Sequence, residues 1–194
     1  MRRSTLSSQS GFTLVELMIT IGVLIVLMTL AVPSFVDLLD RNRVRGAGDA
    51  LISLISNARA EAIKTDLDVS VAMTGGGTAW CMGGHAAMPP SGGNPAGVAD
   101  TCDCTDPGDT TACLVGDQRL AIEVGAHPDV RVGPLPAAFT FDSTLGAIVP
   151  LGARQVTLTS PTGKYDLVTE VNTLGQARLC TPAGKPTMSG IASC

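Results

Sequence analysis

The chain is poor in aromatic residues and in charge. Of its 194 residues, 3% are aromatic and 15% are charged, and the formal net charge at pH 7 is −4. The shortage of aromatic side chains argues against a surface that stacks nucleic-acid bases. The acidic balance argues against binding nucleic acid or anionic membranes through bulk charge. The composition therefore disfavours both a base-stacking surface and a surface that binds nucleic acid or anionic membranes through bulk positive charge.

The sequence also lacks the short motifs of common enzyme classes. It contains no G-x-S-x-G, no P-loop and no H-E-x-x-H. The two histidines, His85 and His127, stand in a glycine-rich loop and in the turn-like GAHPD, outside any nucleophile motif. The single tryptophan, Trp80, precedes Cys81 and is expected to cover a disulfide. We therefore interpret the chain as non-catalytic, and we expect no cofactor and no bound metal.

The longest apolar stretch lies near the N-terminus, from Phe12 to Val32. Only threonines, glycines and one carboxylate, Glu16, interrupt it. About 21 residues is the length that a helix needs to cross a bilayer. A carboxylate inside such a span costs about 2.5–3.5 kcal/mol on insertion scales and is by default functional. Glu16 is therefore expected to have a positively charged partner.

The segment in front of this run, MRRSTLSSQSG, is short, polar and basic, which is typical of the cytoplasmic side of a membrane. An ordinary secretory signal places its apolar core before the cleavage site, whereas here the small-to-aromatic junction Gly11–Phe12 comes first. A cut at this junction removes Arg2 and Arg3, which changes the net charge from −4 to −6. The cut also creates an α-amino group four residues before Glu16. Amine and carboxylate in one apolar layer indicate subunits that pair inside the membrane.

The sequence GFTLVELMITIGVL resembles the class III leader junction of type IV pilins and pseudopilins. The resemblance implies cleavage by a prepilin peptidase between Gly11 and Phe12, and methylation of Phe12 as the new N-terminus. It also implies that Glu16 takes part in subunit assembly. The alternative is a plain signal anchor that carries a chance glutamate.

Six cysteines follow the apolar run: Cys81, Cys102, Cys104, Cys113, Cys180 and Cys194. An even number on the translocated side of a membrane predicts disulfides formed in an oxidising periplasm. A metal site is the alternative, because Cys102, Cys104 and Cys113 are close in sequence, but they lack the paired C-x-x-C spacing of structural zinc. We expect Cys180 to pair with Cys194, which closes the C-terminal tail onto the last strand. The pairing of the other four stays open.

A helical period continues beyond Pro33, a residue expected to kink or loosen the helix. Apolar residues recur every three to four positions, in a stripe that can pack on a sheet. They are Ala47, Leu51, Leu54 or Ile55, Ala58 and Ala62. The sequence therefore predicts one helix from about Phe12 to Lys64.

After Asp66 the pattern changes to short alternating runs between turn residues, which predict strands. The runs are 69–73, 117–124, 137–142, 154–160, 165–171 and 176–180. The Gly/Pro-rich segment 83–113 is irregular, and we expect disulfides rather than core packing to hold it. Its Asp103, Asp106 and Asp109 stand three residues apart, unlike the ligands of an EF-hand loop, so a calcium site there is the less favoured interpretation.

The helix end ARAEAIKT and the later segments FTFDSTLG and LGQARLC resemble the GspH/FimT-type pilin domain. By this resemblance the fold is α+β and pilin-like, with a long N-terminal helix packed on small antiparallel β-sheets. The expected organisation is a leader (1–11), a transmembrane and fibre-core helix (12–35), an amphipathic helix continuing into the globular domain (36–65), and a periplasmic disulfide-containing β domain (66–194).

The resemblance implies a non-enzymatic minor pilin or pseudopilin, a low-abundance subunit of the priming or tip complex of a type IV pilus. Such a protein spans the inner membrane once. Its expected partners are other pilins or pseudopilins, the prepilin peptidase and the inner-membrane assembly platform. The first alternative is the H-type pseudopilin of a type II secretion system.

The second alternative is a tip subunit that binds DNA for natural transformation. Some similar proteins carry a G-R-x-R motif near the C-terminus. This chain has Gly175, Gln176, Ala177 and Arg178 there, so a glutamine replaces the first arginine and one phosphate contact is lost. Arg178 and Lys185 are the candidate DNA contacts.

Overall fold

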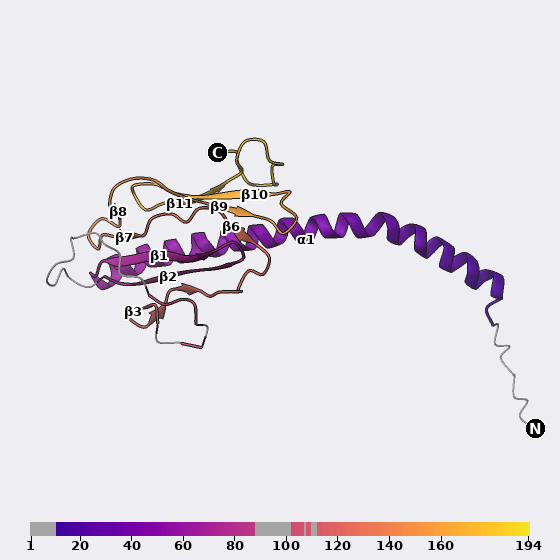
Figure 1. The fold of residues 1–194 in the computed structure, drawn as a ribbon, viewed down its shortest axis with the longest axis horizontal. Helices are drawn as coiled ribbons and strands as arrows, with labels where there is room; N and C mark the ends of the chain where they lie inside the picture. Colours follow the sequence, from indigo (N-terminus) through magenta and orange to yellow (C-terminus); the bar gives the residue numbers. More distant parts are fainter. Residues whose placement is uncertain (1–10, 88–101, 107, 110–111) are drawn as a thin grey trace, which may run out of the picture. The chain divides into compact units, whose positions relative to one another are not determined.

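One long helix followed by short strands makes up the chain (Figure 1). The structure, a computed structural model, describes residues 11–87, 102–106, 108–109 and 112–194. The helix α1 (Leu14–Thr65) confirms the helix that the sequence predicts. Two compact units divide the chain, Met1–Leu39 and Asp40–Cys194, and α1 contributes to both.

In the first unit, α1 is an exposed apolar helix. Thr13 caps its start, because the Thr13 Oγ1 accepts a hydrogen bond from the Glu16 N–H (3.2 Å) in a T-x-x-E arrangement. The helix continues through Pro33 without interruption. Its large apolar side chains from Leu14 to Leu39 are exposed. Cover for this surface must therefore come from outside the described part of the chain.

In the second unit, α1 buries one face. The predicted apolar stripe is confirmed, since Ala47, Leu51, Leu54, Ile55, Ala58 and Ala62 are all buried. Gly48 allows the helix to approach the sheet closely, because a Cβ at this position would lie 2.8 Å from the Leu179 Cδ2.

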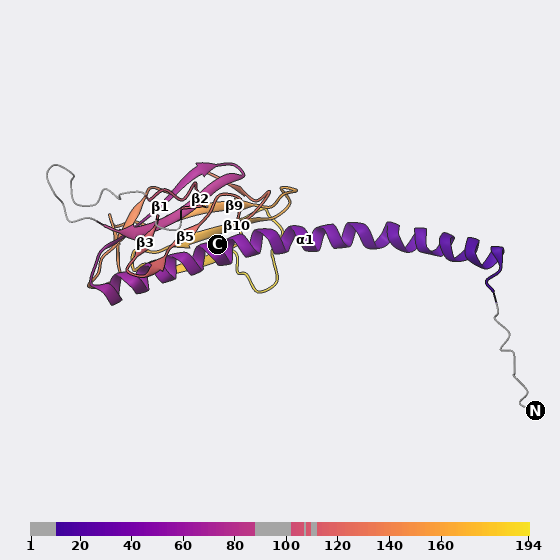
Figure 2. The same ribbon diagram turned by 90° about the horizontal axis from the view of Figure 1, so that it is seen from below.

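The strands of the second unit form two main antiparallel sheets and one small ladder (Figures 1 and 2). The five-stranded sheet has the order β5-β2-β1-β7-β8, made of β5 (Ala121–Ile122), β2 (Ala79–Ala86), β1 (Val69–Gly76), β7 (Phe139–Phe141) and β8 (Ile148–Val149). The four-stranded sheet has the order β11-β10-β9-β6, made of β11 (Ala177–Cys180), β10 (Asp166–Val171), β9 (Arg154–Thr159) and β6 (Arg131–Val132). The ladder joins β3 (Leu114–Val115) to β4 (Gln118–Arg119).

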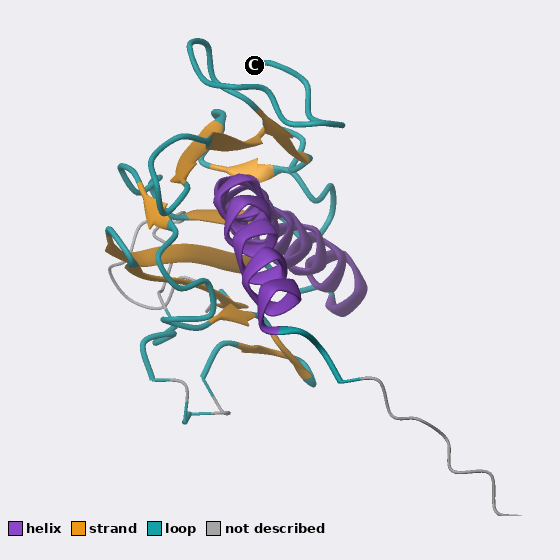
Figure 3. Cartoon of the chain, turned by 90° about the vertical axis from the view of Figure 1, so that its right-hand side faces the viewer, coloured by secondary structure: helices purple, strands orange, loops and turns teal. Residues whose placement is uncertain are grey.

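The helix α1 lies beside strands of the second unit (Figure 3), and buried apolar side chains from α1 and from both main sheets form the main core of this unit. Leu51 and Ile55 of α1 line a small pocket together with Met82 and Phe139 of the five-stranded sheet and Val156 of the four-stranded sheet. The three layers therefore meet at this point. Burial of these side chains is the main force that holds the second unit together.

Most predicted strands are confirmed, and one is wrong. The runs 69–73, 137–142, 154–160, 165–171 and 176–180 contain or overlap β1, β7, β9, β10 and β11. The run 117–124 is not one strand but two, β4 and β5, which lie in different sheets. Leu120 separates them, because its N–H donates to the Cys113 carbonyl (2.8 Å) and its carbonyl accepts from the Gly84 N–H (2.8 Å).

Strand β2 is a further correction, because the predicted irregular segment 83–113 begins inside it. Gly83 and Gly84 obscure the alternation that would identify a strand. The disulfide explains why residue 83 is a glycine. A Cβ there would overlap the Cys102 sulfur and lie 2.7 Å from the Cys113 sulfur. The strand is thus glycine-rich where a disulfide packs on its backbone.

Candidate functional site

The residues of the predicted cleavage junction lie just before α1. Arg2 and Arg3 lie outside the described residues. A Cβ at Gly11 would meet nothing within 4 Å, and Phe12 is 83% exposed. Neither residue belongs to the helix, which begins at Leu14. The junction is therefore open to an enzyme in this conformation.

Glu16 occupies the first turn of α1. The partial positive charge of a helix N-terminus favours a carboxylate at this position. Among the described residues, no side chain pairs with the Glu16 carboxylate, and its backbone N–H is the group that Thr13 caps. The cap is therefore supplied by the Thr13 side chain, and Glu16 contributes its backbone N–H. The sequence signal for this cap is the pattern T-x-x-E.

The helix that carries Glu16 is long and apolar enough to cross a membrane. The apolar stretch of Leu14–Thr65 that meets this length is exposed throughout. This result rests on length and composition.

The three disulfides of the structure use all six cysteines. Cys180 pairs with Cys194, as the sequence favours, with 5.0 Å between their Cα atoms. Backbone hydrogen bonds support this closure, since the Thr181 N–H donates to the Ala192 carbonyl (2.8 Å) and the Cys194 N–H to the Thr181 carbonyl (3.0 Å). Met188, inside the closed loop, is buried in the core. The tail is therefore anchored by sulfur, backbone and apolar contacts together.

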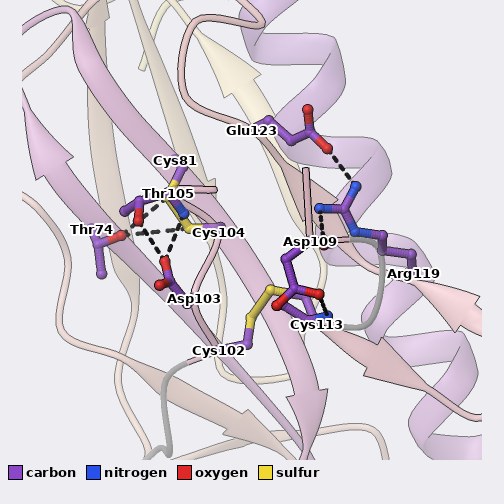
Figure 4. The surroundings of a disulfide bond; sticks show 11 residues. Thr74, Cys81, Cys102, Asp103, Cys104, Thr105, Asp109, Cys113, Arg119 and Glu123 are labelled. Carbon is purple, nitrogen blue, oxygen red and sulfur yellow. Dashed lines mark hydrogen bonds and ion pairs between the residues drawn. A yellow bond between two sulfur atoms is a disulfide. The ribbon is translucent and has the colours of Figure 1, made fainter. Parts of the chain in front are cut away.

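The other two disulfides interleave along the chain (Figure 4). Cys81 pairs with Cys104 and Cys102 with Cys113, at Cα separations of 5.8 and 5.1 Å. Together they form a small buried cluster separate from the main core. These bonds give the pairing that the sequence leaves open. With every sulfur in a disulfide, no thiolate is left for a metal.

The aspartates of the same segment accept hydrogen bonds from nearby groups, and Figure 4 shows two of them, Asp103 and Asp109. Asp103 Oδ1 accepts hydrogen bonds from the Thr105 N–H (2.8 Å) and hydroxyl (2.6 Å), which lower the pKa of Asp103. Asp106 Oδ1 accepts from the Gly108 N–H (2.8 Å), and Asp109 Oδ1 accepts from the Ala112 N–H (3.2 Å). The described residues contain no group of three or more side chains arranged to hold a metal ion.

Trp80 lies in the main core rather than against a disulfide, so that expectation is wrong. Its Nε1 donates to the Val130 carbonyl (3.0 Å), and its ring stacks on His127 with 5.8 Å between centroids and 7° between planes. Burial lowers the pKa of His127. The neutral imidazole is thus part of an aromatic stack.

Both candidate DNA contacts already pair with carboxylates. Arg178 of β11 donates its Nε to Glu170 Oε2 (2.7 Å), and Gln155 donates to the other oxygen of Glu170 (3.1 Å). These hydrogen bonds hold the pKa of Glu170 below its usual value. Lys185 forms an ion pair with Asp166 (3.2 Å). Each positive charge is therefore offset by a neighbouring negative charge.

Gln176, at the position of the missing arginine, stabilises a turn. Its N–H donates to Asn172 Oδ1 (2.9 Å), and its side-chain oxygen accepts from Asn172 Nδ2 (3.0 Å). Gly175 before it has a positive φ of 75°, and a Cβ there would lie 2.5 Å from the Gly146 carbonyl oxygen. Gln176 thus stabilises the turn that joins β10 to β11.

Two families match successive parts of the chain. Residues 6–32 match the family described as Prokaryotic N-terminal methylation motif. Residues 47–175 match the family described as Type II transport protein GspH. No curated protein sequence matches the chain.

Among solved structures, the chain is similar to the type IV minor pilin FimU of Pseudomonas aeruginosa, with 14% identity and a TM-score of 0.47. The match covers 72% of this chain and 89% of that chain.

Proposed function

Because the chain belongs to the family of the type II transport protein GspH and carries the N-terminal methylation motif, we propose that it is a minor pilin that primes or caps a type IV pilus. Members of these families are structural subunits of pili or type II secretion systems. In this role the chain is a low-abundance, non-enzymatic component. Its partners are other pilins or pseudopilins and the inner-membrane assembly platform, and the prepilin peptidase processes it.

The observation that carries the proposal is the Glu16 carboxylate on an exposed apolar helix. A lone charge in a bilayer is costly, and an opposite charge in the same low-dielectric layer lowers that cost. Cleavage after Gly11 supplies such a charge as the α-amino group of Phe12. We propose that Glu16 of one subunit pairs with this amine on a neighbour. The pairing would select subunits for the fibre as they leave the membrane.

The second unit, Asp40–Cys194, is proposed to lie in the periplasm. Its three disulfides support this placement, because such bonds persist in oxidising compartments. The single candidate span would then be the only crossing of the inner membrane within the described chain.

The H-type subunit of a type II secretion system is the alternative form of the same function. The cysteine-closed tail and the ending LGQARLC support the pilus. The neighbouring genes distinguish the two: other minor-pilin genes favour the pilus, and secretion-channel genes favour the secretion system.

DNA capture is a second candidate function, and the exposure of Arg178 supports it, since 70% of this side chain is accessible. The ion pairs of Arg178 and Lys185 weigh against it, because phosphate binding depends on uncompensated positive charge. Gel-shift titration of the full-length chain with duplex DNA at several salt concentrations is the test. A salt-dependent shift that Arg178→Ala abolishes would establish DNA binding, and its absence would discard it.

Processing and fibre location test the main proposal directly. We expect intact-mass measurement to find a chain that begins at methylated Phe12, and sheared surface fibres to contain it. Gly11→Asp should keep residues 1–11 attached and keep the chain in the membrane fraction. Gly22→Ala is the matched control, since a Cβ at Gly22 also meets nothing within 4 Å. A wild-type chain that retains Met1, or that is absent from both fibres and fibre precursors, would refute the proposal.

A further inference from the structure

Strand β11 is an edge strand of the four-stranded sheet. It pairs with β10 on one side, with Ala177 opposite Val171 and Leu179 opposite Thr169. No strand of the described chain pairs with residues 177–179 on the other side. An open edge presents N–H and C=O groups to which another extended chain can bond.

The hydrogen-bond pattern shows which backbone groups face outward. Asn172 donates its N–H to the Gln176 carbonyl (3.0 Å), so these two residues form a hydrogen-bonded pair. Such pairs alternate with non-hydrogen-bonded pairs in an antiparallel ladder. The backbone N–H and C=O of Ala177 and Leu179 therefore point away from β10, toward the open edge.

Thr181 confirms this alternation and shows that the edge accepts an added strand. It has the same parity as Ala177 and Leu179, and its N–H and C=O bond outward to Ala192 and Cys194. The tail runs parallel to β11 at this bridge, with Ser193 opposite Thr181. One step of strand addition thus already occurs within the chain, and the next outward-facing groups lie at Leu179 and Ala177.

A surface groove of about 360 Å³ lies between α1 and the start of this edge, where Ala177 is the residue of β11 that lines it. Its lining residues are Ser56, Arg59, Ala60, Ile63, Gly175, Gln176 and Ala177. On the helix side, Ser56 and Ala60 are small and exposed, and half of the Ile63 side chain is accessible. The groove therefore offers space for a backbone beside Ala177, at the start of β11, and an apolar contact for the side chains of that backbone.

The only charged residue that lines the groove is a cation, Arg59. Its Nε donates to the Gly146 carbonyl (3.0 Å), which fixes the guanidinium beside the groove. No carboxylate lines the same groove. Charge complementarity across an interface therefore calls for an acidic side chain on the occupant.

We propose that β11 binds an extended segment of a different fibre subunit, which adds to the sheet as a further strand. The segment bonds through its backbone to Ala177 and Leu179, and it places an apolar side chain on Ile63 and a carboxylate beside Arg59. Strand addition gives affinity through the main chain and specificity through alternate side chains. The identity of the partner as a fibre subunit rests on the proposed function above, whereas the open edge and the groove do not.

Removal of one outward-facing N–H is the first test. Ala177→Pro deletes a donor that the fold does not use, and proline is tolerated on the free side of an edge strand. Ala177→Ser is the matched control, because it keeps the N–H. We expect Ala177→Pro to lower incorporation of the full-length chain into sheared fibres at least ten-fold, with unchanged membrane levels and disulfides. Equal incorporation of the two variants would overturn the proposal.

Filling the groove is the second test, and it leaves β11 unchanged. Ala60→Trp places a large ring in the groove, whereas Asn57→Trp places it on an exposed helix position that does not line the groove. We expect only Ala60→Trp to reduce incorporation at least ten-fold. A reduction by both variants or by neither would contradict a specific groove.

A photo-crosslinker identifies the occupant. Benzoylphenylalanine in place of Ile63, in cells that assemble fibres, is expected to crosslink to a strand-forming, Asp- or Glu-containing segment of another fibre subunit. Ala177→Pro should abolish the adduct. An adduct with lipid, with a helix or with a second copy of this chain, or one that Ala177→Pro leaves unchanged, would overturn the proposal.

The failure of this inference is distinguishable from failure of the proposed function. If Glu16→Gln blocks incorporation while Ala177→Pro incorporates normally, the fibre role stands and strand addition is wrong. If the wild-type chain never enters fibres, both are wrong.

Discussion

The two halves of α1 have the same secondary structure and opposite surroundings. From Leu14 to Leu39 the apolar side chains are exposed, whereas from Val44 to Ala62 the apolar stripe is buried under the sheets. An apolar surface of the first kind on a monomer marks contact with a membrane or another protein. The second half is thus covered within the chain, whereas the first half presents an apolar surface suited to lipid or to another protein.

The start of the buried half is marked by a polar anchor. Asp40 is 3% exposed, and its carboxylate accepts hydrogen bonds from the Thr162 N–H (3.1 Å) and hydroxyl. A buried carboxylate is stable only when its oxygens are bonded in this way. Asp40 thus attaches the helix to the turn between β9 and β10 at the first residue of the second unit.

Loss of the tail disulfide should have the largest effect on the stability of the second unit. For the double variant Cys180→Ser, Cys194→Ser we expect a loss of about 3 kcal/mol in the free energy of unfolding, as for a closed loop of roughly 15 residues. Denaturant unfolding of the full-length chain in detergent measures it, with emission of the buried Trp80 as the probe. Membrane insertion should not change. An unchanged unfolding midpoint would show that Met188 and the backbone bonds anchor the tail alone.

Substitution of Gly83 should affect the second unit less. Gly83→Ala places a Cβ against the Cys102–Cys113 disulfide, and overpacking of this kind costs about 1–3 kcal/mol. Gly76→Ala, in the neighbouring strand, is the control because a Cβ there meets nothing within 4 Å. The same Trp80 unfolding assay compares them. Equal stability of the two variants would contradict the close packing of the disulfide on β2.

Two glycines in the buried half of α1 should differ in how much an alanine substitution stabilises the second unit. Gly46 is exposed with open space at its Cβ, so Gly46→Ala should stabilise the second unit by about 0.5–1 kcal/mol. Gly48→Ala should gain less, because the new Cβ must displace the Leu179 side chain. The difference between the two unfolding free energies is the measurement. A larger gain for Gly48→Ala would show that this helix does not pack closely on β11.

The smallest expected effect is the pH dependence from His127. Burial lowers its pKa below the usual 6.5, so between the two pKa values the unfolded chain binds more protons than the folded chain. Stability should therefore fall as the pH drops below about 6.5. Thermal unfolding from pH 7.5 to 5 measures this, and His127→Phe, which keeps the stack on Trp80, should flatten the curve. If the slope is the same with phenylalanine, His127 is not its source.

The sequence predicts the long helix and most of the longer strands well because their signals are local. The apolar stripe through Leu51 and Ala58 and the alternation of β9 and β10 both follow from the period of side chains along one element. The N-terminal methylation motif is also readable, since residues 6–32 form a contiguous pattern. Thr13 belongs to the same pattern as the first residue of T-x-x-E.

The parts that the sequence does not predict depend on distant contacts. Gly83 makes β2 look irregular until the Cys102–Cys113 bond is placed on it, and Leu120 divides one predicted strand because it bonds to Cys113 and Gly84. The pairing of Arg178 with Glu170 likewise depends on the register of β10 and β11. The candidate DNA site could therefore be located from the sequence, but its neutralisation could not.

The most direct test of the account is the charge of Glu16. Glu16→Gln keeps a side chain that can complete a capping box with Thr13 and removes only the negative charge. The account predicts normal processing and membrane insertion with at least ten-fold less chain in sheared fibres, while Thr13→Val, which removes the cap, should have a smaller effect. Incorporation of Glu16→Gln equal to that of the wild-type chain would contradict the pairing of Glu16 with a neighbouring subunit.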